Sequence, residues 1–276
     1  MGLLTFFSIK KIQEPKNVMK KQADFSSFSC VTDYIYEKSG ITDLDTRALA
    51  ASRMQQYAMS QNIYTSGKFL NMMKENTSFY QEIINIATVN ETFFMREIRE
   101  LEWLVDYIQT TSKKLKILSM PSSSGEEIYS ILIMLSQRGI SLDKVEIYGY
   151  DINSHAIKNA QDGCYEEHSL HKLDTDVRMK YFTQEENIYK ISSSLEKYTQ
   201  FKQSNIFEID TNKQKFDVVL SRNMFIYFDD EKRERALNVI VKLLNLNGIY
   251  IKGHADQINE TKYLEKIDYG VYKKVL

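Results

Sequence analysis

Acidic and polar side chains follow three separate apolar runs of this chain. Glu126 comes shortly after the first run, Asp151 ends the second, and Arg222 and Asn223 follow the third. If the runs are parallel strands, their carboxyl ends meet at one edge of a sheet, where ligands of open α/β sheets bind. The spacing therefore predicts one ligand site that these four side chains share.

The first run begins a strand, a turn and a helix. Leu115–Leu118 is apolar, Ser119–Gly125 is a serine-rich turn with a single glycine, and Ile128–Leu135 is apolar at the spacing of a helix. Doubly wound nucleotide-binding sheets begin in this way, and the ligand lies close to the backbone of the turn. The pattern predicts an α/β fold with a doubly wound, Rossmann-like sheet.

Two carboxylates at the head of that helix, Glu126 and Glu127, narrow the choice of ligand. A phosphate-binding turn leaves its helix end bare and positive, whereas two glutamates would repel a pyrophosphate. They suit a ligand with hydroxyl groups and a positive charge, such as S-adenosyl-L-methionine. Acidic residues in a first helical turn also complement the helix dipole without any ligand. These two residues alone leave both interpretations open.

Asp151 lies 25 residues beyond Glu126, at the end of the second expected strand, Val145–Asp151. An acidic residue at this place in such folds holds ribose hydroxyls. Asp151 could also cap the next expected helix, Asn153–Ala160, and the two roles are compatible. The strand and helix on either side favour the ribose role.

The composition is that of an ordinary globular protein, with 43% hydrophobic and 26% charged residues in a chain of 276. The formal net charge of −1 gives no reason to expect nucleic acid as a partner. Cys30 and Cys164 are far apart and match no metal or redox motif, which predicts a reducing, cytoplasmic setting and no metal site. No apolar run is long enough to insert into a membrane. We expect a monomer.

Apolar residues recur at helical spacing from Phe25 to Tyr80, and no strand pattern appears before residue 110. We therefore predict two domains with a linker between them. The expected segments are a tail (1–21), an all-helical domain (22–84), a linker helix (85–110) and an α/β domain (111–276) with a small antiparallel β element inserted at about 163–204.

The second expected helix carries Arg47 and Arg53, nearly two turns apart. Basic residues on a surface helix are usually a solvated face. The alternative is that they dock an acidic helical partner. The two residues alone do not decide between these interpretations.

Several stretches together resemble one family, the CheR-type chemotaxis-receptor glutamate methyltransferases. Asn90–Glu97 is similar to its Thr-x-Phe-Phe-Arg signature, with Met95 in place of the second Phe, and Ser119–Glu127 is similar to its Ser-x-x-x-Ser-x-Gly-Glu-Glu loop. Tyr150–Ile152 resembles its Ser/Thr-Asp-Ile motif, and Phe216–Phe228 resembles its Phe-Asp…Cys-Arg-Asn-x-x-Ile-Tyr-Phe block. Gly253–Asp256 departs from the usual Gly-His-Ser-Glu. The motifs occur in the family's order and cover nearly the whole chain.

The resemblance implies a class I methyltransferase sheet that binds S-adenosyl-L-methionine and releases S-adenosyl-L-homocysteine. It implies cofactor contacts from Asn90, Thr92, Arg96, Glu126, Asp151, Asn205, Ile206, Arg222 and Asn223. The cofactor role of Asn90 and the choice of Asn205 and Ile206 rest on the resemblance alone. The substrates would be glutamates on the cytoplasmic methylation helices of chemotaxis receptors, with Arg47 and Arg53 in the docking helix.

Arg96, or a polar group near Tyr227, is expected to hold the second oxygen of a substrate carboxylate, which makes Arg96 and Tyr227 the candidate catalytic residues. Some family members grip a receptor pentapeptide through a glycine-containing loop of the inserted β element. The corresponding turn here, Thr183–Asn187, has no glycine, which predicts an enzyme that works without this tether.

Three other functions remain to be weighed. A methyltransferase for another substrate is disfavoured by the helical domain with its arginines. A non-catalytic docking or cofactor-binding module is disfavoured because Asn90, Arg96, Glu126 and Asp151 are all present. A nicotinamide oxidoreductase is the weakest alternative, because no Gly-x-Gly-x-x-Gly follows the first strand.

Overall fold

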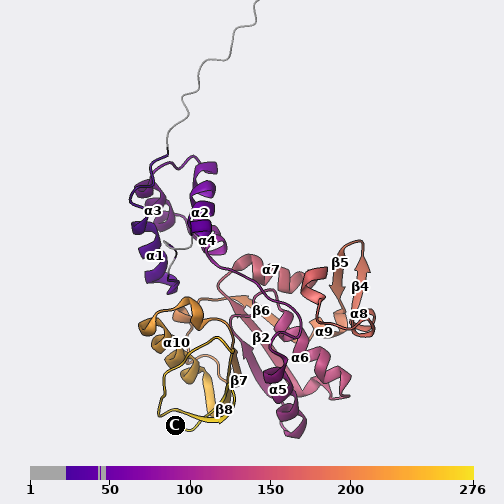
Figure 1. The fold of residues 1–276 in the computed structure, drawn as a ribbon. Coiled ribbons are helices and arrows are strands. Elements are labelled where there is room, and N and C mark those ends of the chain that lie inside the picture. The colour runs from indigo at the N-terminus through magenta and orange to yellow at the C-terminus, as the bar shows by residue number, and fades with distance from the viewer. Residues whose placement is uncertain (1–22, 43, 45–47) are drawn as a thin grey trace, which may run out of the picture.

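The computed structural model describes residues 23–42, 44 and 48–276 (Figure 1). The described part begins with helices α1 (Ser29–Ser39), α2 (Ala48–Ser60), α3 (Ser66–Glu75) and α4 (Thr77–Ala87). Side chains from all four helices form one apolar core. Thr65 and Asn76 cap α3 and α4 with their side-chain oxygens, because these positions leave backbone N–H groups free. The predicted tail, residues 1–21, lies outside the described residues.

The sheet that follows confirms the predicted doubly wound fold. Its strand order is β6-β2-β1-β7-β8-β10-β9, parallel from β6 to β8 and antiparallel at β10 and β9. The strands are β1 (Leu115–Ser119), β2 (Val145–Asp151), β6 (Thr199–Gln203), β7 (Phe216–Ser221), β8 (Leu244–Lys252), β9 (Leu264–Asp268) and β10 (Val271–Lys274). Ser119 pairs with Gly149 on one side and Leu220 on the other, so the carboxyl ends of β1, β2 and β7 meet at one edge.

Helices cover both faces of this sheet. The helices beside this sheet are α5 (Ile98–Thr110), α6 (Glu126–Gln137), α7 (Ser154–Asp162) and α10 (Asp230–Leu243). α5 and α6 share a core with alternate strand residues such as Ile117 and Ile147, whereas α10 packs on the opposite face with Leu118 and Val219. Figure 1 shows α10 and the α5–α6 pair on opposite sides of the sheet. Short 3₁₀ helices are η1 (Leu142–Lys144), η2 (Glu167–Leu170), η3 (Ile206–Glu208) and η4 (Phe225–Tyr227).

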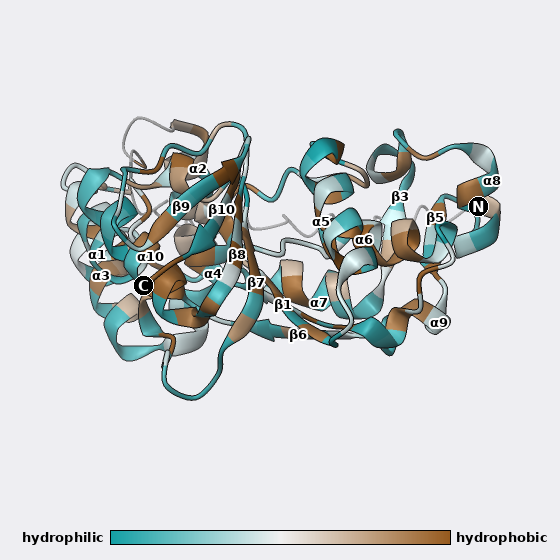
Figure 2. Ribbon diagram, turned by 90° about the horizontal axis from the view of Figure 1, so that it is seen from below, coloured by the Kyte–Doolittle hydropathy of each residue, from teal (hydrophilic) through white to brown (hydrophobic). Residues whose placement is uncertain are grey.

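A small antiparallel sheet separates α7 from β6. Its strands are β3 (Cys164–Glu166), β4 (Phe182–Glu185) and β5 (Ile188–Ile191), accompanied by the short helices α8 (Thr175–Tyr181) and α9 (Ser193–Glu196). The predicted inserted element is present, but its expected end near residue 204 is too late. The segment at 199–203 is β6, which pairs with β2 in the main sheet. Figure 2 shows β5 and α8 at the opposite end of the molecule from α1 and α3.

The predicted linker helix, residues 85–110, is wrong in its first half. α4 ends at Ala87, and α5 begins only at Ile98. The backbone between them leaves helical geometry at Met95 and Glu97, whose φ angles are +61° and +47°. The segment 88–97, called the linker loop below, therefore carries Asn90, Thr92 and Arg96 as loop residues.

The N-terminal helices pack against the carboxyl edge of the sheet. Tyr36 donates a 2.7 Å hydrogen bond to Asp229, and Asn205 Nδ2 donates to the carbonyl of Lys38 at 2.9 Å. Gly40 ends α1 with φ of +76°, and a Cβ there would lie 2.7 Å from Phe207. These contacts fix the end of α1 above the strand ends. Within the described residues, none of the helices has the length and apolar character that crossing a bilayer requires.

Candidate functional site

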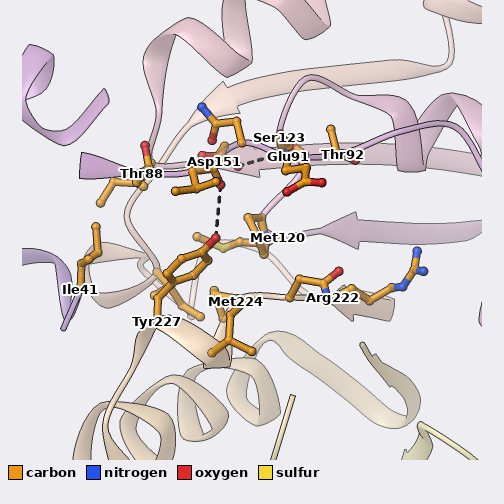
Figure 3. Close-up of a pocket in the computed structure, with 18 of the residues that line it drawn as sticks. Ile41, Thr88, Glu91, Thr92, Met120, Ser123, Asp151, Arg222, Met224 and Tyr227 are labelled. Atoms are coloured by element: carbon orange, nitrogen blue, oxygen red, sulfur yellow. Dashed lines mark hydrogen bonds between the residues drawn. The ribbon is translucent and has the colours of Figure 1, made fainter. Parts of the chain in front are cut away.

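A cavity lies between the end of α1, the linker loop and the carboxyl ends of β1, β2 and β7 (Figure 3). It contains every predicted cofactor contact except Glu126. The lining residues are Ser39, Ile41, Ala87, Thr88, Val89, Asn90, Glu91, Thr92, Phe93, Arg96, Met120, Pro121, Ser122, Ser123, Glu127, Asp151, Ile152, Ser204, Asn205, Ile206, Arg222, Asn223, Met224, Ile226, Tyr227 and Phe228.

Asp151 ends β2 in the wall of this cavity, as predicted. Its Oδ2 accepts a hydrogen bond from Ser123 N and its Oδ1 accepts one from Asn153 N, both at 2.8 Å. Burial raises the pKa of Asp151 to about 6, against the opposing effect of these amide hydrogen bonds. The cap of α7 is Asn153, whose side chain accepts from Ala156 N, and not Asp151. Asp151 therefore has no capping role.

The turn after β1 brings small polar groups to the cavity. Gly125 has φ of +92° and precedes α6, a backbone conformation that favours glycine. Ser122 and Ser123 line the cavity, and their buried hydroxyls have no hydrogen-bond partner among the described residues. Buried polar groups normally have partners, so these hydroxyls point to a polar ligand.

The two glutamates of the turn have different surroundings, and the structure does not place Glu126 in the cavity. The carboxylate of Glu126 is buried behind the turn, where it accepts hydrogen bonds from the hydroxyls of Ser124, at 2.8 and 2.9 Å, and of Ser169, at 3.4 Å. Burial raises its pKa. Neighbouring helical residues project in different directions, and it is Glu127 that lines the cavity.

Arg222 joins Glu127 to the linker loop. Its Nη1 lies 2.6 Å from Glu127 Oε2, and its Nη2 donates to the carbonyls of Arg96 and Glu97. Nη2 also lies 3.4 Å from Glu97 Oε2. Only Nε of this buried guanidinium lacks a partner among the described residues. Arg222 lines the cavity as predicted, while most of its hydrogen-bonding capacity is used within the protein.

Asn223 follows Arg222 in a strained turn with φ of +59°. Its side chain donates to Glu97 Oε1 at 3.1 Å, and its backbone N–H donates to Asp256 Oδ2 at 2.6 Å. The carboxylate of Asp256 also accepts from Phe225 N and Gly253 N. Burial raises the pKa of Asp256. The turn at the end of β7 is therefore held from two sides by carboxylates.

The linker loop presents Asn90, Thr92 and Arg96 to the cavity. Arg96 donates to the carbonyl of Glu91 at 2.6 Å, which curls the loop onto itself. Behind the loop, the fully buried ring of Phe94 packs edge-on against aromatic rings of the small sheet. Its backbone N–H donates to the carbonyl of Ser169 at 2.9 Å. The small sheet thus supports the back of the linker loop.

Tyr227, Ile206 and Asn205 also line the cavity. Tyr227 donates from its hydroxyl to the carbonyl of Val89 at 3.3 Å, across the cavity (Figure 3). Ile206 is buried in the wall, and Asn205 caps η3 by accepting from Phe207 N. Of the two predicted docking residues, Arg53 is exposed on α2, and Arg47 lies outside the described residues.

These features fit S-adenosyl-L-methionine. Asp151 and the two unpartnered serine hydroxyls offer groups for ribose and amino acid atoms. Met120, Ile206, Met224 and Phe228 supply apolar walls for a purine. The acidic lining residues Glu91, Glu127 and Asp151 suit a ligand that carries a positive charge.

Some lining residues were missed by the sequence reasoning. Glu127 was considered together with Glu126 in the sequence but was not assigned to the cofactor, and its pairing with the buried Arg222 appears only in the structure. Ser39 and Ile41 come from the end of α1, far from the sheet in sequence. No sequence motif marks them, because they reach the cavity only through the packing of α1 against the edge of the sheet.

Comparison with known proteins agrees with this site. The model of the CheR methyltransferase SAM-binding domain matches residues 90–272. The chain is 34% identical to a chemotaxis protein methyltransferase of Campylobacter jejuni, over 86% of this chain and 92% of that protein. It is 31% identical to chemotaxis protein methyltransferase 2 of Vibrio cholerae, over 86% of both chains. It is 27% identical to the Escherichia coli chemotaxis protein methyltransferase, over 84% of both. This chain belongs to the CheR family of S-adenosylmethionine-dependent methyltransferases.

Proposed function

We propose that this methyltransferase esterifies glutamate side chains on the cytoplasmic methylation helices of chemotaxis receptors. The observation that carries the proposal is that eight of the nine predicted cofactor contacts, all but Glu126, line one cavity. The homologues named as chemotaxis protein methyltransferases, matched over most of the chain, supply the substrate class.

The reaction needs little acid–base chemistry from the protein. S-adenosyl-L-methionine supplies an electrophilic methyl group when bound. A glutamate carboxylate is already ionised near pH 7, so its oxygen can attack without a general base. The protein's main tasks are to bring the two reactants into line and to exclude water. The apolar walls at Met120, Met224 and Phe228 serve the second task.

Asp151 is the group assigned to the ribose hydroxyls, with Ser122 and Ser123 next to it. Glu127 replaces Glu126 in this assignment, because only Glu127 reaches the cavity. Arg222 and Asn223 complete the strand-end wall. Asn90, Thr92, Asn205 and Ile206 are assigned to the cofactor on the family resemblance and on their place in the lining.

Arg96 and Tyr227 are assigned to the substrate carboxylate. Both line the cavity, and both are half-buried. A guanidinium or a phenol can donate a hydrogen bond to the carboxylate oxygen that is not methylated. Such a bond would hold the attacking oxygen in line.

Docking of the receptor is assigned to α2, where the exposed Arg53 can meet acidic residues of a helix. The β4–β5 hairpin supports operation without a pentapeptide tether. Its turn is Glu186–Asn187, with Glu186 at φ of +53° and no glycine. We propose that receptors are methylated whether or not they carry such a C-terminal peptide.

The test is transfer of labelled methyl from S-adenosyl-L-methionine to membranes that contain chemoreceptors of the same organism. Alkali-labile label in the receptor bands supports the glutamate ester, and equal rates on receptors with and without their last five residues support tether independence. Cofactor binding without incorporation would show that the substrate is a different one.

A further inference from the structure

We propose that Glu97 is a positioning residue that holds the linker loop against the end of β7. Its Oε1 accepts a hydrogen bond from Asn223 Nδ2 at 3.1 Å, and its Oε2 accepts one from His254 N at 3.0 Å. Oε2 also lies 3.4 Å from Arg222 Nη2. One carboxylate thereby joins three segments that are far apart in the sequence.

The backbone conformation at Glu97 directs its carboxylate to Asn223 and His254, and the side chain does not cap α5. Glu97 immediately precedes α5, where a side chain commonly accepts from the first free N–H groups, yet it makes no such bond. Its φ of +47° is a conformation that non-glycine residues adopt only when surrounding contacts enforce it. The carboxylate is turned away from α5 and toward the strand end.

His254 is held in place by a second carboxylate. Its Nε2 lies 2.7 Å from Oε1 of Glu100, whose side chain is fully buried. Glu97, Glu100 and His254 each have one atom that could bind a metal ion, and these atoms lie within 4.8 Å of one another. Both oxygens of Glu97 already accept hydrogen bonds, and a guanidinium lies beside one of them. Hydrogen bonds therefore occupy both oxygens of Glu97 within this cluster.

The link to function is through Arg222 and Asn223, which line the cavity. Glu97 itself is not among the lining residues, so it acts on the site through these two side chains and through the loop that carries Arg96. This inference rests on the proposed use of the cavity for S-adenosyl-L-methionine. It predicts that Glu97 sets cofactor affinity.

The test compares Glu97→Gln with Glu102→Gln in the full-length enzyme. Glu102 is exposed on the same helix and serves as the matched control. Hydrogen bonds to charged groups are strong, so Glu97→Gln is expected to raise the Kd and KM for S-adenosyl-L-methionine by about tenfold or more. The kcat at saturating cofactor is expected to fall as well, because the linker loop that Glu97 holds also carries Arg96. Glu102→Gln is expected to match the wild type.

Calorimetry gives the Kd of the folded fraction, which a role in folding alone would not change. An unchanged Kd in Glu97→Gln would overturn the inference. If that variant fails to fold, Glu97→Asp decides, because it keeps the charge but shortens the reach. It is expected to bind the cofactor more weakly than the wild type, and a wild-type Kd would overturn the inference. A wild-type protein that binds no cofactor would instead refute the proposed function.

Discussion

Nη1 of Arg222 and Oε2 of Glu127 lie 2.6 Å apart, with side-chain exposures of only 4% and 13%. The pair joins the end of β7 to the first turn of α6 in the wall of the cavity. Burying two charges is costly unless they are paired and hydrogen-bonded, and Ser119 satisfies the second oxygen of Glu127 at 2.8 Å. Losing the pair should therefore lower the stability of the folded protein and also disturb the cavity wall.

Arg222→Ala is expected to destabilise the protein by about 3–5 kcal/mol, because it leaves the mostly buried carboxylates of Glu97 and Glu127 without their cation. Cofactor binding should be lost as well, since the linker loop loses its hydrogen bonds to Arg222. Urea unfolding and calorimetry measure the two effects. Arg99→Ala removes an exposed pair with Asp268 and a contact with the ring of Tyr269, and it should cost at most about 1 kcal/mol. Similar losses in the two variants would contradict the assignment.

Separate exchanges of Glu126 and Glu127 for glutamine test which of the two contacts the cofactor. The sequence favoured Glu126, and the structure places Glu127 in the cavity. Glu127→Gln is expected to weaken S-adenosyl-L-methionine binding by about tenfold, because the residue lines the cavity and neutralises Arg222. Glu126→Gln should leave the Kd within about threefold, because its carboxylate faces Ser124 and Ser169. Isothermal titration checks both. The opposite order of effects would restore Glu126 as the cofactor contact.

Cofactor affinity is expected to depend on pH through Asp151. Its pKa of about 6 in the free protein means that the carboxyl is ionised above pH 6 and protonated below it. If ribose hydroxyls donate to the ionised form, the proton must leave on binding, so the Kd should rise by up to about tenfold per pH unit below 6. Calorimetry from pH 5 to 8 measures this. Asp151→Asn should bind weakly without the slope, and a flat wild-type profile would argue against the ribose role.

Two glycines provide a test of how α1 closes the cavity. Gly40→Ala is expected to destabilise the protein by about 1–3 kcal/mol, because φ is +76° and the new Cβ would lie 2.7 Å from Phe207. Cofactor binding should weaken too, since the adjacent Ser39 and Ile41 line the cavity. Gly67→Ala in α3 meets nothing within 4 Å and should be neutral or stabilising by up to about 1 kcal/mol. Equal melting temperatures for the two variants would contradict the proposed role of the end of α1 in closing the cavity.

The position of the strand-end residues could be predicted from the sequence, because it follows from the geometry of a parallel sheet. Asp151, Arg222 and Asn223 follow buried parallel strands, and parallel strands bring their carboxyl ends to one edge. The choice between Glu126 and Glu127 was not predictable in this way. It depends on the direction in which each residue leaves the first turn of α6, and so on the position of Arg222.

Tertiary contacts also explain the two errors in the expected elements. The apolar spacing after Asn85 is helical, but contacts of Glu97 with Arg222 and Asn223 hold that residue at positive φ and delay α5 to Ile98. β6 has polar residues on its exposed side because it is an edge strand of the main sheet. In the sequence that polarity resembles a strand of the small sheet.

Four non-glycine residues in the loops around the cavity have positive φ angles: Met95, Glu97, Ser123 and Asn223. Each such conformation costs about 1–3 kcal/mol, which the folded protein carries whether or not it is working. Selection for heat resistance alone should therefore favour glycine at these four places. Selection for turnover should oppose it, because Ser123 and Asn223 line the cavity and Glu97 holds Asn223 and Arg222 in its wall. The heat tolerance of this enzyme is thus expected to improve most readily at the expense of its affinity for the methyl donor.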